Sequence, residues 1–212
     1  MTDSIEQQIR LADNYSAQLE RLLFNKSIPI NTNRDELCML YWSLIFDHHR
    51  GILLLLQTKR YAPAFALVRP ITEAFFRLYV AIHGTEPQLE ALKNGTYNTD
   101  FASISEQIDR SFWGRSFWGD EPLFGPRFNK ERTQILHGFT HGGLEQLARR
   151  KSGTNIVPNY PEDEIRSVVS DTTMFAFLAA PMVTEFLDFK AERQKGLQMF
   201  DEYLGPEPPL EV

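Results

Sequence analysis

Cysteine is nearly missing from this sequence, because Cys38 is the one thiol in 212 residues. A single thiol cannot form an internal disulfide, and it is too few for a zinc site built on cysteines. We therefore interpret Cys38 as a small, packed helix residue rather than a nucleophile. The chain has to be held together by a hydrophobic core instead.

Long apolar runs and linkers are also missing. Charged residues interrupt each apolar segment before it reaches the roughly 20 residues that a membrane span requires. The N-terminal stretch MTDSIEQQIRLADNY lacks the basic start and the apolar stretch of a signal peptide. We therefore expect a cytoplasmic protein without a membrane segment, built as one domain over residues 1–212 with a frayed tail at 205–212.

No stretch alternates apolar and polar residues as a half-buried strand would, and apolar residues instead recur every three or four positions. We predict an all-α, up-and-down bundle of four to five long helices plus two short ones. The long helices are expected at Asp3–Asn25, from Asn33 past Leu55, from Arg60 or Tyr61 to Gly84, at Phe128–Arg150 and from Pro161 to about Gln194; the short ones are expected at Thr85–Gly95 and Thr99–Arg115.

The second of these helices is predicted to begin with Asn33 as its cap and Glu36 three positions later. Its apolar stripe is assigned to Leu37, Leu40, Tyr41, Leu44, Ile45, Ile52 and Leu55. His48 lies on that stripe and Asp47 flanks it, so His48 is expected to face inward. It is either a hydrogen-bonded core histidine or a residue of a functional site.

The stretch Lys59–Gly84 is apolar nearly all the way round, which predicts a central helix kinked at Pro70. It also carries Arg69, Glu73 and Arg77 at successive i,i+4 positions. Buried charges have to pair with each other and with polar groups of neighbouring helices. The segment RTQILHGFTHGG, residues 132–143, is rich in such groups, so we expect the two segments to meet.

The region from residue 112 to 150 is rich in glycine and aromatic residues. Gly138, Gly142 and Gly143 predict a close backbone approach or a break within Phe128–Arg150. The loop FWGRSFWGDEPLFGP, residues 112–126, is expected either to cover a groove or partner surface or to pack on the bundle. Its aromatic residues are Phe112, Trp113, Phe117, Trp118 and Phe124.

Negative charge dominates the chain, but it is unevenly spread. The formal net charge of −6 argues against nucleic-acid binding by the whole surface. Between residues 127 and 151, six basic residues stand against Glu131 and Glu145, which gives +4 there and −10 elsewhere. The basic residues are either solvated charges or a local anion site. They are Arg127, Lys130, Arg132, Arg149, Arg150 and Lys151.

Arg132 and His137 form an R-x4-H pattern, and Arg77 with His83 forms a second match, R-x5-H. With the segments LVRPITEAFFRLYVAIHG and LHGFTHGG, this pattern resembles the HEPN superfamily of small, all-helical and often dimeric bundles. The likeness is closest to an uncharacterised bacterial HEPN-like family and extends from about Arg34 to Phe189. Its best-matching pieces are Arg69, Pro70, Glu73 and Leu136–Gly143.

Many HEPN proteins are metal-independent endoribonucleases of toxin or defence systems. The resemblance implies a homodimer that binds RNA or a nucleotide, has an antitoxin-type protein partner and needs no cofactor. His137 would act as general base or acid on an RNA 2′-hydroxyl, with His141 nearby, while Arg132 would stabilise charge on the phosphate. Lys130, Arg149, Arg150 and Lys151 would contact nucleic acid, and Arg69, Glu73, Arg77, His48 and Asp47 would support the site. Thr133 departs from the family, in which Asn is common at that position.

Helix geometry leaves other interpretations open. Arg132 and His137 stand about 140° apart on an ideal helix, so they converge only at an irregularity or across a dimer. His137 and His141 stand about 40° apart, a spacing that metal-binding helices use, and Glu73 could complete such a site with Asp47 and His48. Alternatively, the two histidines satisfy Glu73 and Arg69 structurally, and the protein is a non-enzymatic binding module.

Overall fold

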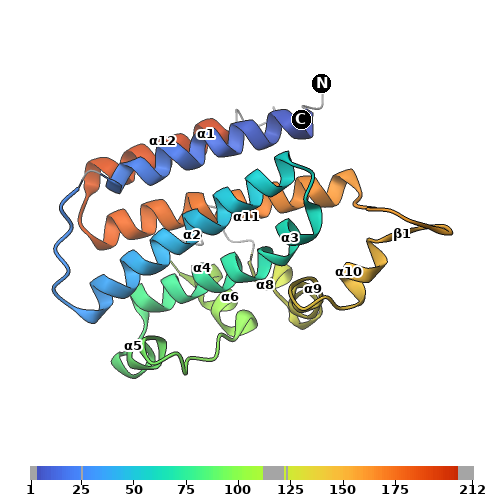
Figure 1. Cartoon of the computed structure of the whole chain (residues 1–212). Coiled ribbons are helices and arrows are strands. Elements are labelled where there is room, and N and C mark those ends of the chain that lie inside the picture. The colour runs from blue at the N-terminus through green and yellow to red at the C-terminus, as the bar shows by residue number, and fades with distance from the viewer. Residues whose placement is uncertain (1–3, 25, 112–121, 123, 205–212) are drawn as a thin grey trace, which may run out of the picture.

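A computed structural model of the chain describes residues 4–24, 26–111, 122 and 124–204 (Figure 1). Within these residues, five helices have 15 or more residues, and the remaining helices are shorter. The predicted all-α bundle is therefore confirmed. The long helices are α1 (Ile5–Phe24), α2 (Asn33–Gln57), α4 (Val68–His83), α11 (Glu162–Phe186) and α12 (Lys190–Leu204).

Helix α11 packs against α1, α2, α4 and α12 (Figure 1). Helix α4 packs against α2 and α11 and is flanked by the shorter helices α3 (Tyr61–Ala66), α5 (Glu86–Lys93), α6 (Phe101–Arg110) and α9 (Lys130–Thr140). By length and composition α11 could cross a membrane, and 78% of its apolar window is buried inside the bundle, as in a core helix. The buried side chains of all five long helices form one continuous core.

Helix α2 begins at a cap one residue earlier than predicted. Thr32 accepts a hydrogen bond from the Asp35 backbone N–H, and the Asp35 carboxylate accepts one from the Thr32 N–H, so these two residues form the capping box. The predicted inward stripe was also rotated. His49 is fully buried, while Leu40 and Leu44 are exposed and His48 is half-buried. Burial raises the pKa of the Cys38 thiol to about 12, as expected for a packed residue.

The predicted kink at Pro70 is a break three residues earlier. Helix α3 (Tyr61–Ala66) ends at Ala66, and Leu67 separates it from α4. Pro70 has no N–H to donate to the carbonyl of Ala66, the residue four positions before it. The Thr140 hydroxyl of a neighbouring helix lies 3.3 Å from that carbonyl oxygen and donates to it. The break is therefore compensated from outside the helix.

The short helices α5 (Glu86–Lys93), α6 (Phe101–Arg110) and α8 (Phe124–Arg127) follow. Thr85 and Gln88 form a capping box for α5. Most of the predicted aromatic loop lies outside the described residues, but Phe124 is fully buried. Its ring packs on Phe75, Phe128 and Phe175 and so fixes α8 to the core.

The predicted helix Phe128–Arg150 is two helices, α9 (Lys130–Thr140) and α10 (Leu144–Ala148). The break falls at Gly142, whose φ of +69° favours glycine. After α10, a small hairpin of β1 (Lys151–Ser152) and β2 (Asn155–Ile156) projects from the bundle with α10 (Figure 1). The predicted last helix is also two, because Asp188 with φ of +57° ends α11 and α12 turns back along α1.

Candidate functional site

The two segments that the sequence predicts to meet do so where α4 faces α9. The Arg69 Nη1 atom lies 3.0 Å from the His137 Nδ1 atom. His141, the residue that caps the C-terminus of α9, places its ring 4.3 Å from the ring of His137. Both histidines are exposed to solvent. We call Arg69, Glu73, Arg77, His137 and His141 the histidine–arginine cluster.

The contact between Arg69 and His137 fixes the tautomer of the imidazole. A guanidinium only donates hydrogen bonds, so Nδ1 of His137 has to accept one and carries no proton. The proton of the neutral ring then lies on Nε2. Nδ1 holds the lone pair that a general base needs, but it is free to act only when Arg69 turns away.

The charge row on α4 pairs internally, as predicted. One Glu73 oxygen lies 3.1 Å from Arg69 Nη2, and the other lies 3.9 Å from Arg77 Nη2. The row is half-buried and not fully enclosed as expected, because the Arg69, Glu73 and Arg77 side chains are 24%, 26% and 35% exposed. Two guanidiniums therefore share one carboxylate at the edge of the core, which leaves one positive charge in the row.

Other contacts hold the two arginines of the row in place. Arg77 Nε donates to Thr99 Oγ1 at 3.0 Å, and Arg77 also hydrogen-bonds Tyr41. Arg69 lies 5.7 Å from the centre of the Phe101 ring, within the range of a cation–π contact. The guanidiniums are positioned before any ligand arrives.

Arg132 is not part of this cluster within one chain. Helix α9 is regular from Lys130 to Thr140, so Arg132 points away from His137. Its Nη2 atom lies 3.5 Å from Asp171 Oδ2 on α11, and Arg127 Nη1 lies 3.1 Å from Asp171 Oδ1. Burial raises the pKa of Asp171, and the two arginines partly offset this rise. The predicted Arg132–His137 pair is corrected to two pairs, Arg69 with His137 and Arg132 with Asp171.

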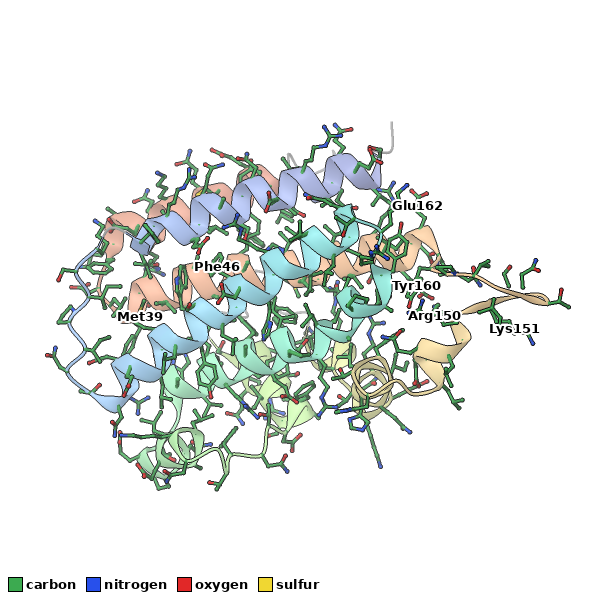
Figure 2. The ribbon with its side chains drawn as sticks, in the orientation of Figure 1. Met39, Phe46, Arg150, Lys151, Tyr160 and Glu162 are labelled. Atoms are coloured by element: carbon green, nitrogen blue, oxygen red, sulfur yellow. The ribbon has the colours of Figure 1, made fainter. Side chains whose placement is uncertain are left out.

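The predicted nucleic-acid contacts divide into two groups. Arg149 is half-buried and donates through Nε and Nη2 to the two oxygens of Glu164, so it is held by α11. Lys130, Arg150 and Lys151 are exposed. Figure 2 shows Arg150 and Lys151 on the projecting arm and not within the bundle.

Helix α2 carries Asp47 and His48, which were predicted to support the site. Asp47 is exposed, and burial lowers the pKa of His48 while Asp47 raises it. Two polar residues that the sequence did not single out are the fully buried His49 and the half-buried Asp171. Asp171 carried a signal, because it is the one carboxylate between Glu164 and Glu185.

The alternative metal site at His137, His141 and Glu73 is not formed. Glu73 is engaged by both arginines of its row, and Nδ1 of His137 accepts from Arg69. Within the described parts of the chain, no three His, Cys, Asp or Glu side chains are close enough together to hold a metal ion.

Comparison of the chain with models of protein families, with curated proteins and with solved structures found no match.

Proposed function

We propose that this chain is a HEPN-like protein that binds RNA through the histidine–arginine cluster and cleaves it without a metal ion. The observation that carries the proposal is the 3.0 Å contact between Arg69 and His137 at an exposed surface. It joins a phosphate-binding guanidinium to an imidazole, the two groups that metal-free cleavage of a phosphodiester requires.

The chemistry follows from the tautomer of His137. An RNA phosphate competes with His137 for the Arg69 guanidinium, since charge-assisted hydrogen bonds to phosphate are strong. When Arg69 moves to the phosphate, Nδ1 of His137 is free to take the proton of the 2′-hydroxyl. The 2′-oxygen then attacks phosphorus, the bond to the 5′-oxygen breaks, and His141 in its protonated form gives a proton to that oxygen.

The exposed face of α9 supports binding of an extended phosphate backbone. Lys130, Gln134, His137 and His141 are all exposed and follow a spacing of three or four residues along the helix. Each side chain can donate a hydrogen bond, and the row of α4 adds a positive charge beside them. In this proposal Lys130, Arg150 and Lys151 contact phosphates, and the protein is a cytoplasmic homodimer of a toxin or defence system with an antitoxin-type partner.

The test is cleavage of total tRNA in EDTA by the purified chain. We expect His137→Ala and Arg69→Ala each to reduce the rate by roughly 10²-fold, the usual scale for a general base or a charge-stabilising donor. Arg110→Gln is the matched control, because Arg110 is 79% exposed on α6.

Three results would contradict the proposal. The wild-type chain could fail to cleave, or His137→Ala could cleave equally, which would indicate a contaminating nuclease. A loss in Arg132→Ala with none in Arg69→Ala would overturn the assignment to Arg69 and favour a site shared between two chains.

A further inference from the structure

A second candidate site lies on another side of α9. An open cavity of about 510 Å³ lies between α9 and α10 on one side and α11 on the other. A neighbouring cavity of about 570 Å³ continues it toward α8, and both are lined by Arg132, Ile135, Ser167 and Asp171. We call the two together the α9–α11 groove. Each cavity falls within the roughly 300–1,000 Å³ of small-molecule sites.

The inner part of the groove is apolar. Its walls include Phe65, Val68, Leu136, Phe139 and Val168, core residues that retain 4% to 8% exposure. The rings of Phe65 and Phe139 lie 5.2 Å apart. Leu144 stands at the rim and is 80% exposed. A ligand with an apolar body would remove all of these surfaces from water.

The outer part of the groove offers more hydrogen-bond donors than acceptors. Asp171 holds Arg127 and Arg132 by one ion pair each and also accepts from the Ser167 hydroxyl. A guanidinium has five N–H donors, so most of them remain to bind a ligand. The two arginine side chains are 46% and 52% exposed, which keeps those donors within reach. Glu131 also lies at this end and opposes a negative ligand.

The part of the groove lined by Arg149 and Glu164 carries a neutral ion pair. Arg149 donates through Nε and Nη2 to Glu164, so it offers much less to a charged group. Glu145 also lines this cavity and opposes a negative ligand. The groove is thus apolar in the middle, and at one end it holds two guanidiniums that are fixed by Asp171 and keep N–H donors for a ligand.

We propose that the α9–α11 groove binds a small organic carboxylate with an apolar body. The carboxylate bonds Arg127 and Arg132, whose positions Asp171 sets in advance, and the body lies against Phe65 and Phe139. The site is separate from the RNA chemistry proposed above, because none of the five residues of the histidine–arginine cluster lines it.

The probe is anilinonaphthalene sulfonate, an aromatic anion whose fluorescence rises in apolar sites, with decanoate as the competitor. We expect about one probe bound per chain, displaced by decanoate well before decanol or decylammonium, which share its apolar chain. Arg127→Gln and Arg132→Gln should each weaken decanoate binding about tenfold, the loss expected for one hydrogen bond to a charged group. Glu131→Gln should strengthen it.

Ala148→Trp tests the position of the apolar body. Ala148 is exposed and lines the cavity, so the indole should fill the space without disturbing the core. Circular dichroism verifies the fold of each variant, and Arg10→Gln on α1, 77% exposed, is the matched control. Equal displacement by decanoate and decylammonium would overturn the proposal, as would undiminished binding in Ala148→Trp or in both arginine variants.

Discussion

His49 shows at the scale of one residue how a buried polar group is satisfied. Its ring lies between α1 and α11, with Nδ1 2.9 Å from Ser16 Oγ and Nε2 3.1 Å from Thr173 Oγ1. Thr173 gives its own proton to the Val169 carbonyl at 2.6 Å, so its oxygen accepts from Nε2. Ser16 then donates to Nδ1. The neutral ring has both nitrogens paired and ties three helices together.

This burial makes the stability of the fold depend on pH. Burial lowers the pKa of His49 to about 3, far below the ordinary value of 6.5. Between these values the unfolded chain binds a proton that the folded chain does not, so the free energy of unfolding falls as the pH falls. From pH 7 to pH 5, we expect His49 to contribute a loss of about 2 kcal/mol.

Urea unfolding of the wild type and His49→Gln at pH 7, 6 and 5 measures this contribution. Glutamine can keep hydrogen bonds to the hydroxyls but does not titrate, so its stability should fall less over that range. Parallel curves for the two proteins would show that His49 is not the titrating group.

Two predictions about single residues show which contacts could be predicted from the sequence and which could not. The meeting of Arg69 with the histidine segment was predictable, because a charged row on an apolar helix has to find partners. The choice of His48 over His49 was wrong because Leu40 and Leu44 look like core residues and are exposed. A stripe drawn through them is rotated by about 100°, the turn of one residue.

At the scale of elements, the junction of α3 and α4 depends on another helix. Leu67 keeps helical dihedrals, so the chain is interrupted chiefly by the donor that Pro70 lacks. Thr140 on α9 supplies one proton, shared between the Ala66 carbonyl at 3.3 Å and the Leu136 carbonyl at 3.0 Å. The same contact brings α9 against α4, where Arg69 meets His137. The proline thus helps to position the candidate site.

A double-mutant cycle tests this compensation. Thr140→Val keeps the shape of the side chain and removes the donor, so we expect a loss of about 1 kcal/mol in the free energy of unfolding. In a Pro70→Ala background, the new N–H can bond the Ala66 carbonyl, and the cost of Thr140→Val should fall below about 0.5 kcal/mol. The measurement is urea unfolding of the four proteins. An equal cost in both backgrounds would show that Ala66 does not depend on Thr140.

The boundaries of elements were predictable where a residue type forces them. Gly142 and Pro70 both marked real interruptions, and the predicted short helix after Gly84 begins directly after Thr85. The end of α11 was not predictable, because the apolar period runs on through Phe186 and Phe189 without glycine or proline. Asp188 adopts a left-handed conformation there, which aspartate tolerates better than most residues.

At the scale of the whole molecule, periodicity was sufficient for the fold class but not for the arrangement. The structure buries fifteen of the 25 residues of α11 and ten of the 16 residues of α4, so both helices contribute to the core. Helix α9 meets α4 through Arg69 and His137 and meets α11 through Arg132 and Asp171. This placement separates Arg132 from His137, which the sequence pattern had joined.

Because α9 has two such sides, the two proposed activities should be separable. His137 and His141 belong to the α4 side, whereas Arg132, Leu136 and Phe139 line the groove toward α11. We expect Ala148→Trp to lose binding of anilinonaphthalene sulfonate while it cleaves tRNA at the wild-type rate, and His137→Ala to show the reverse. Urea midpoints close to that of the wild type would show that neither variant acts by unfolding the chain, since surface substitutions usually change stability by no more than about 0.5 kcal/mol. If Ala148→Trp also stopped cleavage at unchanged stability, the groove would be part of the path of the RNA. Arg132 would then again be a candidate catalytic residue, although it points away from His137 within one chain.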